Sequence, residues 1–148
     1  MRSILLDTGP LGLAVHPRPV PGFRAWLASL RASGTTIVVP EIAHYELRRE
    51  LLRMDQPVSI DRLDRLIAAC AYAPITTSII LRAAQLWAEA RRQGRPTADD
   101  RALDGDVILA ATAEGIIASG DDVIVATTNV AHLQRFVPAA TWDRIPGQ

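Results

Sequence analysis

The chain has 148 residues, of which 49 per cent are apolar and 22 per cent charged, a composition typical of a globular domain. Sixteen basic residues balance sixteen acidic ones, which excludes a uniformly basic nucleic-acid-binding surface. The single cysteine, Cys70, excludes an intramolecular disulfide and a cysteine-based zinc site. No segment approaches the roughly 18 apolar residues that span a bilayer. We therefore expect one cytoplasmic domain over residues 1–148, without a membrane segment.

Short apolar runs that stop at turn residues predict strands, and longer runs with apolar side chains three and four positions apart predict helices. Gly9 and Pro10 are expected to end regular structure after the first strand. The expected strands cover residues 2–6, 36–39, 74–76 and 122–129, with a last short strand near Trp142 and Ile145. The expected helices cover residues 23–34, 41–54, 59–72, 78–93 and 106–115, followed by a helical turn or two at 131–136.

The expected strands alternate with one or two helices, which is the pattern of an α/β fold built on a parallel sheet. In such sheets ligands bind beyond the carboxyl ends of the strands, near the point where the strand order reverses. Asp7 follows the first expected strand and Asn129 follows the fourth. The sequence therefore predicts a polar site at this edge of the sheet.

Acidic and amide side chains recur at corresponding places of this topology. Three or four carboxylates in one pocket repel each other, and such pockets normally hold hard divalent cations. Mg²⁺ and Mn²⁺ prefer oxygen ligands and can support in-line attack on a phosphodiester. The residues concerned are Asp7, Glu46, Asp104, Asp106 and Asn129.

Each of these residues also has a purely structural interpretation. Asp7 could cap the segment that follows it, and Glu46 could form an i,i+3 pair with Arg49 worth only a few tenths of a kcal/mol. Asp104 and Asp106 are both good N-cap residues for the helix expected to begin near Asp106. The five residues together therefore indicate a metal site more specifically than any one of them does alone.

The absence of lysine separates rival α/β phosphate enzymes. An aspartate at the end of the first strand also suits aspartyl-phosphate phosphatases and receiver domains, but both families use a lysine against the phosphoryl group. A P-loop nucleotidase needs its lysine as well. All sixteen basic residues of this chain are arginines, and no G-x-G-x-x-G motif follows the first strand. The sequence therefore argues against these classes and against Rossmann-type dinucleotide binding.

Four stretches of the chain form a recognisable set: "ILLDTGPL" at 4–11, "VPEIAHYELRREL" at 39–51, "DGDVILAATA" at 104–113 and "VATTNVAHLQRF" at 125–136. In this order they resemble VapC-type PIN-domain ribonucleases, the toxins of bacterial toxin–antitoxin pairs. The resemblance implies a single PIN-like domain, a three-layer α/β/α fold with a doubly wound, mainly parallel sheet of about five strands. It also implies a divalent-metal endoribonuclease that forms homodimers and is neutralised by a small cognate antitoxin.

The resemblance also implies roles for individual residues. Asn129 departs from the aspartate of many relatives, which removes one negative charge and leaves open whether the site holds one ion or two. Gly9 departs as well, since many relatives have asparagine or serine there. The residues expected to bind Mg²⁺ or Mn²⁺ are Asp7, Glu46 and Asp106, and those expected to support the ion or the attacking water are Asp104, Asn129 and Thr127.

Arginines near Glu46 are candidate contacts to the RNA backbone, because a guanidinium binds phosphate through two hydrogen bonds. They are Arg48, Arg49 and Arg53, and they could equally form salt bridges within the helix, across a dimer or with an antitoxin. The histidines match no zinc motif and are interpreted as ordinary polar residues: His16, His44 and His132.

The leading hypothesis is therefore a metal-dependent endoribonuclease acting as the toxin of a toxin–antitoxin pair. One alternative is a PIN-fold module that binds RNA or protein with weak or no catalysis. A second is a nuclease of RNA maturation that has no antitoxin.

Overall fold

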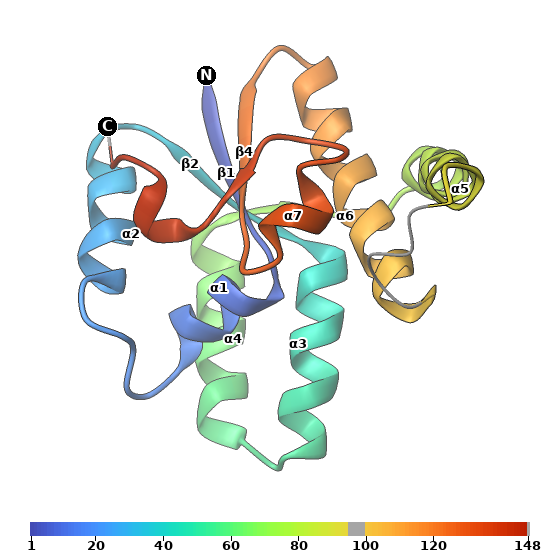
Figure 1. Cartoon of the computed structure of the whole chain (residues 1–148). Coiled ribbons are helices and arrows are strands. Elements are labelled where there is room, and N and C mark those ends of the chain that lie inside the picture. Colours follow the sequence, from blue (N-terminus) through green and yellow to red (C-terminus); the bar gives the residue numbers. More distant parts are fainter. Residues whose placement is uncertain (95–99, 148) are drawn as a thin grey trace.

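The computed structural model describes residues 1–94 and 100–147, apart from the side chains of 100–102. It shows one five-stranded parallel sheet with helices on both sides (Figure 1). The strands are β1 (Arg2–Leu6), β2 (Thr36–Pro40), β3 (Ala71–Ala73), β4 (Asp122–Ala126) and β5 (Ala139–Ala140). The helices are α1 (Thr8–Val15), α2 (Phe23–Ala32), α3 (Glu41–Arg53), α4 (Pro57–Ala69), α5 (Thr77–Arg92), α6 (Asp100–Ala118) and α7 (Val130–Leu133), with a 3₁₀ turn at Trp142–Arg144.

The strand order is β3-β2-β1-β4-β5, and every pair is parallel. The strand β1 lies at the centre, where Ile4 is in register with Ile37 of β2 and Ile124 of β4. The chain runs from β1 to one edge of the sheet and later returns to β4 on the other side of β1. The carboxyl ends of β1 and β4 therefore flank the point where the strand order reverses, as the doubly wound prediction requires.

Alternation along β1 divides the core between the two faces of the sheet. Ile4, Leu5 and Leu6 are all fully buried, as expected for a central parallel strand. Leu5 packs with apolar residues of α5, α6 and α7, whereas Ile4 and Leu6 pack with those of α1 to α4. The helix α5 packs against α6 at the margin of the molecule (Figure 1). The predicted three-layer α/β/α fold is thus confirmed.

Residues after β1 form the helix α1, so the prediction that Gly9 and Pro10 end regular structure is wrong. Pro10 lies in the first turn of α1, where the backbone N–H has no partner inside the helix and its loss costs little. The backbone N–H of Leu11 closes this turn by donating to the carbonyl of Asp7, 2.9 Å away.

Two short strands also differ from the predictions. β3 covers Ala71–Ala73 rather than 74–76, because the Ile75 N–H donates to Glu41 and the Thr76 side chain caps α5. The last strand is Ala139–Ala140, whereas Trp142 belongs to a 3₁₀ turn and packs its ring on Phe23 and Trp26.

The helix α6 begins at Asp100 instead of near Asp106. Asp104 and Asp106 therefore lie inside the helix, and neither is its N-cap. Leu103 is 5 per cent exposed, and its packing in the core favours the longer helix despite Gly105. None of the helices in the described ranges combines the length and apolar content that a bilayer crossing needs.

Candidate active site

Polar side chains converge where β1 and β4 end. Asp7 directly follows β1, and Thr127 directly follows β4. The Asp7 N–H donates to the carbonyl of Ala126 at 3.0 Å, which continues the pairing of the two strands up to the site. Glu46 enters from α3 and Asp106 from α6, so four elements contribute to this edge of the sheet.

Asp7 is both the N-cap of α1 and a member of the site. Its Oδ1 accepts the Thr8 N–H at 2.7 Å, and its Oδ2 accepts the Thr127 hydroxyl at 2.7 Å. Thr127 is 1 per cent exposed, and its Oγ1 also accepts the Asn129 N–H at 2.9 Å. Burial raises the pKa of Asp7, and the hydrogen bonds from Thr127 and Thr8 partly offset that rise. The two interpretations of Asp7 offered by the sequence, a helix cap and a site residue, are therefore compatible.

Glu46 faces Asp7 from α3. The Thr8 hydroxyl donates to Glu46 Oε1 at 2.9 Å, so Thr8 contacts both acids, one through its backbone and one through its side chain. Burial raises the pKa of Glu46 and the charge of Asp7 raises it further, while the Thr8 hydrogen bond lowers it. On the solvent side, an Arg49 Nη lies 4.0 Å from Glu46 Oε2, and its guanidinium covers the Tyr45 ring at 4.9 Å.

Asp106 is the least compensated acid of the site. Its Oδ2 is buried and has no hydrogen-bond partner among the described residues. The imidazole of His132 lies beside it, with Nδ1 3.8 Å from Asp106 Oδ2, which is beyond hydrogen-bonding distance. Burial raises the pKa of Asp106 to about 6, with a further contribution from the charge of Asp7. A buried carboxylate oxygen without a donor is an atom that a bound water or a metal ion would satisfy.

The three acids suit a hard divalent cation. The charge of Asp7 raises the pKa values of both Glu46 and Asp106, and a cation would relieve this repulsion and give Asp106 Oδ2 the partner that it lacks among the described residues. In the described part of the chain, no group of three or more His, Cys, Asp and Glu side chains is arranged to hold a metal ion as it stands. The donor chemistry therefore fits Mg²⁺ or Mn²⁺, and closer convergence of these side chains would be needed for direct ligation.

Two predicted members lie outside this group. Asp104 is exposed on α6, two positions before Asp106, and two residues turn a helix by about 200°. Its carboxylate is not among the charges that act on Asp106. Asn129 is exposed and precedes α7, and its side chain makes no capping hydrogen bond. Among the described residues, the link between Asn129 and the site is the hydrogen bond from its backbone N–H to Thr127 Oγ1.

Two of the candidate RNA-binding arginines are engaged within the chain. The Arg48 Nε donates to His44 Nε2 at 2.8 Å, and an Arg48 Nη pairs with Asp64. Arg53 pairs with Glu50 one turn earlier. Only Arg49 of the three reaches the acidic group, and its side chain is 57 per cent exposed.

Gly105 and His132 belong to the site although sequence reasoning gave them no role there. A Cβ at Gly105 would lie 2.8 Å from Glu46 Oε2, so the missing side chain makes room for that carboxylate against α6. A glycine between two aspartates was the available signal. His132 offers no comparable signal, since its approach to Asp106 depends on how α7 packs against α6.

Comparisons with known proteins give no match to a family model and no match to a curated protein sequence. Solved structures do match. The VapBC2 complex from Rickettsia felis, bound to a DNA fragment from its promoter, contains a chain with a TM-score of 0.74 and 19 per cent identity, covering 95 per cent of this chain and 99 per cent of that one. A chain of FitAcB from Neisseria gonorrhoeae has a TM-score of 0.70 and 23 per cent identity, covering 96 per cent of this chain and 99 per cent of that one. A chain of VapBC-1 from nontypeable Haemophilus influenzae has a TM-score of 0.68 and 20 per cent identity, again covering 96 per cent of this chain and 99 per cent of that one.

The chain has a PIN-like fold. The resemblance to VapC-type PIN domains that the four sequence stretches indicate is thereby confirmed at the level of the fold. At these identities the likeness concerns the backbone, and the roles of individual residues remain predictions.

Proposed function

We propose that the chain is a divalent-metal-dependent endoribonuclease and the toxin of a toxin–antitoxin pair. The observation that carries the proposal is the buried Asp106 Oδ2, which has no partner among the described residues and lies beside two further acids at the switch point of a PIN-like sheet. The structural neighbours named VapBC support the toxin assignment. A small cognate antitoxin and a homodimer are the partners that this proposal implies.

In the proposed mechanism, Asp7, Glu46 and Asp106 would hold Mg²⁺ or Mn²⁺, which when bound lowers the pKa of a water and offsets charge developing on phosphorus. The chain itself fixes the orientation of two of these acids. Thr127 donates to Asp7 Oδ2 and Thr8 donates to Glu46 Oε1, so both carboxylates are restrained in the resting site. Asp7 Oδ1 is held by the backbone of α1, and the buried Thr127 limits water on the side of β4.

The proposal is tested by RNA cleavage with Mn²⁺. Asp7→Asn keeps an N-cap side chain for α1 but removes the charge, so we expect a loss of at least about 100-fold in kcat/KM, or about 2.7 kcal/mol. The matched control is Asp61→Asn, which changes an exposed acid paired with Arg65 on α4. Undiminished cleavage by Asp7→Asn, with both proteins folded by circular dichroism, would contradict the assignment.

The toxin assignment has a separate test. Induced expression of the wild type in a bacterial host is expected to arrest growth, and expression of Asp7→Asn is not. Co-expression of a short reading frame adjacent to the gene should restore growth. Cleavage in vitro without growth arrest would instead favour the alternative of an RNA-maturation nuclease.

A non-catalytic PIN module is the second candidate, favoured by two observations. Asn129 removes a possible fourth acid, and the acids of the described residues do not form a three-ligand group as they stand. Calorimetric titration with Mn²⁺ separates the candidates. The nuclease proposal expects binding that is lost in Glu46→Gln, whereas the module predicts no binding that depends on this residue.

A further inference from the structure

The phosphate-binding group of the site need not come from α3. Arg48 and Arg53 on that helix already have carboxylate partners, and each would have to break an ion pair to bind RNA. Another arginine, Arg135, follows α7, and its Nε donates to the carbonyl of His132, whose Nδ1 lies 3.8 Å from Asp106 Oδ2. The charge of Arg135 opposes the rise in the pKa of Asp106.

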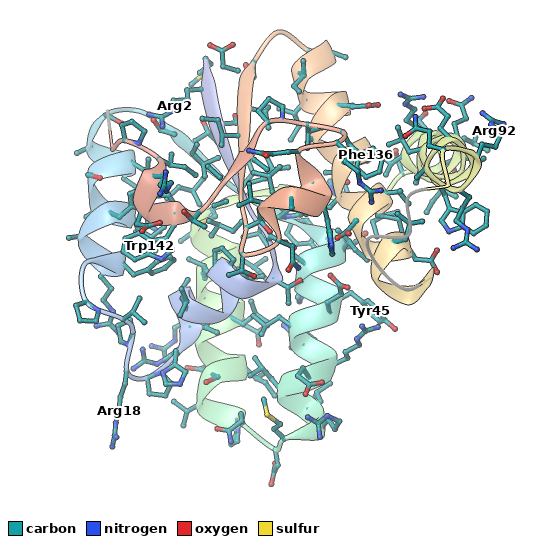
Figure 2. All side chains as sticks on the ribbon, viewed as in Figure 1. Arg2, Arg18, Tyr45, Arg92, Phe136 and Trp142 are labelled. Carbon is teal, nitrogen blue, oxygen red and sulfur yellow. The ribbon has the colours of Figure 1, made fainter. Side chains whose placement is uncertain are left out.

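The guanidinium of Arg135 is held in a defined orientation. Its Nε donates to the carbonyl of His132 at 3.1 Å, and its Cζ lies 5.0 Å from the centroid of the Phe136 ring. Figure 2 labels Phe136 beside α6, on the side of the sheet where α5 and α6 pack. The terminal nitrogens of Arg135 form no hydrogen bond or ion pair with another described residue. One edge of the fork is anchored, and the other is available.

Charges around Arg135 leave this end available. Arg135 lines a hollow of about 190 Å³ between α5, α6 and the segment that follows α7, and Arg82, Glu89 and Glu114 line it as well. Arg82 binds Glu114 through two hydrogen bonds, of 2.7 and 3.2 Å, so Glu114 already has its own cation. No carboxylate of the described residues lies within ion-pair distance of Arg135.

We propose that Arg135 binds a backbone phosphate of single-stranded RNA next to the acidic site. The inference rests on the proposed function and adds the substrate contact that the α3 arginines do not provide. A planar fork with two available N–H donors matches a phosphate through paired hydrogen bonds. Anchoring of Nε and stacking on Phe136 reduce the side-chain freedom lost on binding.

The test measures RNA binding, which is independent of cleavage. A fluorescent single-stranded RNA is titrated into Asp7→Asn protein at several salt concentrations, with and without Arg135→Gln. Loss of one phosphate contact should lower the slope of log Kd against log salt by about 0.7, because each neutralised phosphate of a single strand contributes about that much. Arg135→Lys keeps the charge and should keep the slope. The matched control, Arg65→Gln, removes an exposed arginine of α4 and should also leave it unchanged.

Arg135→Met serves as a second variant in case Arg135→Gln misfolds, because it keeps an alkyl chain against Phe136. It must show the same reduced slope as Arg135→Gln. A slope equal to that of Arg65→Gln, or no RNA binding by the parent protein, would overturn the inference. If the slope falls as expected but the wild type does not cleave RNA, the contact stands and the nuclease proposal fails. The two proposals can therefore fail separately.

Discussion

Helix α3 contributes to two polar clusters, one in which the acids are paired with donors and one in which the pairing is only partial. The first cluster, here called the pairing network, begins where Arg48 Nε donates to His44 Nε2. The proton of the neutral His44 ring is therefore on Nδ1, which lies 2.8 Å from the Tyr72 hydroxyl. Tyr72 donates in turn to Glu41 Oε2 at 3.1 Å. Asp64 closes the network by pairing with Arg48.

The pKa shifts of the pairing network agree with the direction of its hydrogen bonds. Burial and the charge of Arg48 lower the pKa of His44, which favours the neutral ring that this donor order requires. Burial and the bond to Glu41 raise the pKa of Tyr72 to about 12, so its hydroxyl remains a donor. The second oxygen of Glu41 accepts the Ile75 N–H at 2.9 Å. Every acid of this cluster has a donor.

The acidic site also combines carboxylates with hydroxyl donors, but its charges are less completely paired. Asp7 and Glu46 each have hydroxyl donors, yet burial raises the pKa values of all three acids, and the charge of Asp7 adds to the rise at Glu46 and Asp106. Asp106 Oδ2 has no donor among the described residues. The comparison teaches that one helix can contribute both to a cluster whose charges are all paired and to a cluster that contains an unpaired buried carboxylate, the kind of group that is typical of functional sites.

The largest expected difference concerns pH in metal-free buffer. Burial raises the pKa of Asp106 to about 6 in the folded chain, against about 3.9 in the unfolded chain. Between these values the folded state retains a proton that the unfolded state releases, so stability falls as the pH rises from about 4 to about 6. The loss is about 3 kcal/mol at most.

Urea unfolding of the wild type and Asp106→Asn in EDTA, at pH 4 and pH 7, measures this effect. Asp106→Asn lacks the titrating group and is expected to be the more stable protein at pH 7, with the difference shrinking toward pH 4. An equal pH dependence in both proteins would show that Asp106 is not destabilised by its surroundings.

Metal binding gives the next effect in size. Mn²⁺ at 100 times its Kd should raise the free energy of unfolding by about 2.7 kcal/mol, because it binds the folded state. Glu46→Gln should lose most of this gain, whereas Asp64→Asn in the pairing network should keep it. Thermal melts with Mn²⁺ and with EDTA provide the measurement, and equal responses in the two variants would remove the distinction between the clusters.

The smallest effect is expected in the pairing network itself. Tyr72→Phe removes the hydroxyl that joins His44 to Glu41, so the free energy of unfolding should fall by about 1 to 2 kcal/mol. RNA cleavage should stay within about twofold of the wild type once the protein is folded, since Tyr72 has no contact with the acidic site. Denaturant melts and cleavage assays of the same preparation check both expectations. A loss of activity larger than the loss of folded protein would connect the clusters.

The features that sequence predicts best are those with a long local pattern. The central strands and most helices follow from apolar periodicity, while β3 and β5 have three and two residues and are too short to carry one. The helix α1 contains Gly9 and Pro10, which usually end regular structure, and forms because Pro10 occupies its first turn.

The candidate site divides in the same way. Family-like motifs point to Asp7, Glu46 and Asp106, which the fold brings into electrostatic contact. The separate positions of Asp104 and Asp106 depend on where α6 begins, and its start near Asp100 was not apparent from the sequence. The surroundings of His132 and Arg135 depend on packing between helices distant in sequence, which no local pattern encodes.

Gly105 shows how stability and a working site can oppose each other at a single atom. Alanine would favour the interior of α6 by about 1 kcal/mol, yet its methyl group would lie 2.8 Å from Glu46 Oε2. The end of the glutamate side chain would yield before the helix backbone does. A variant selected for thermal stability alone would therefore tend to acquire alanine here and displace a carboxylate of the acidic site, with the fold itself intact.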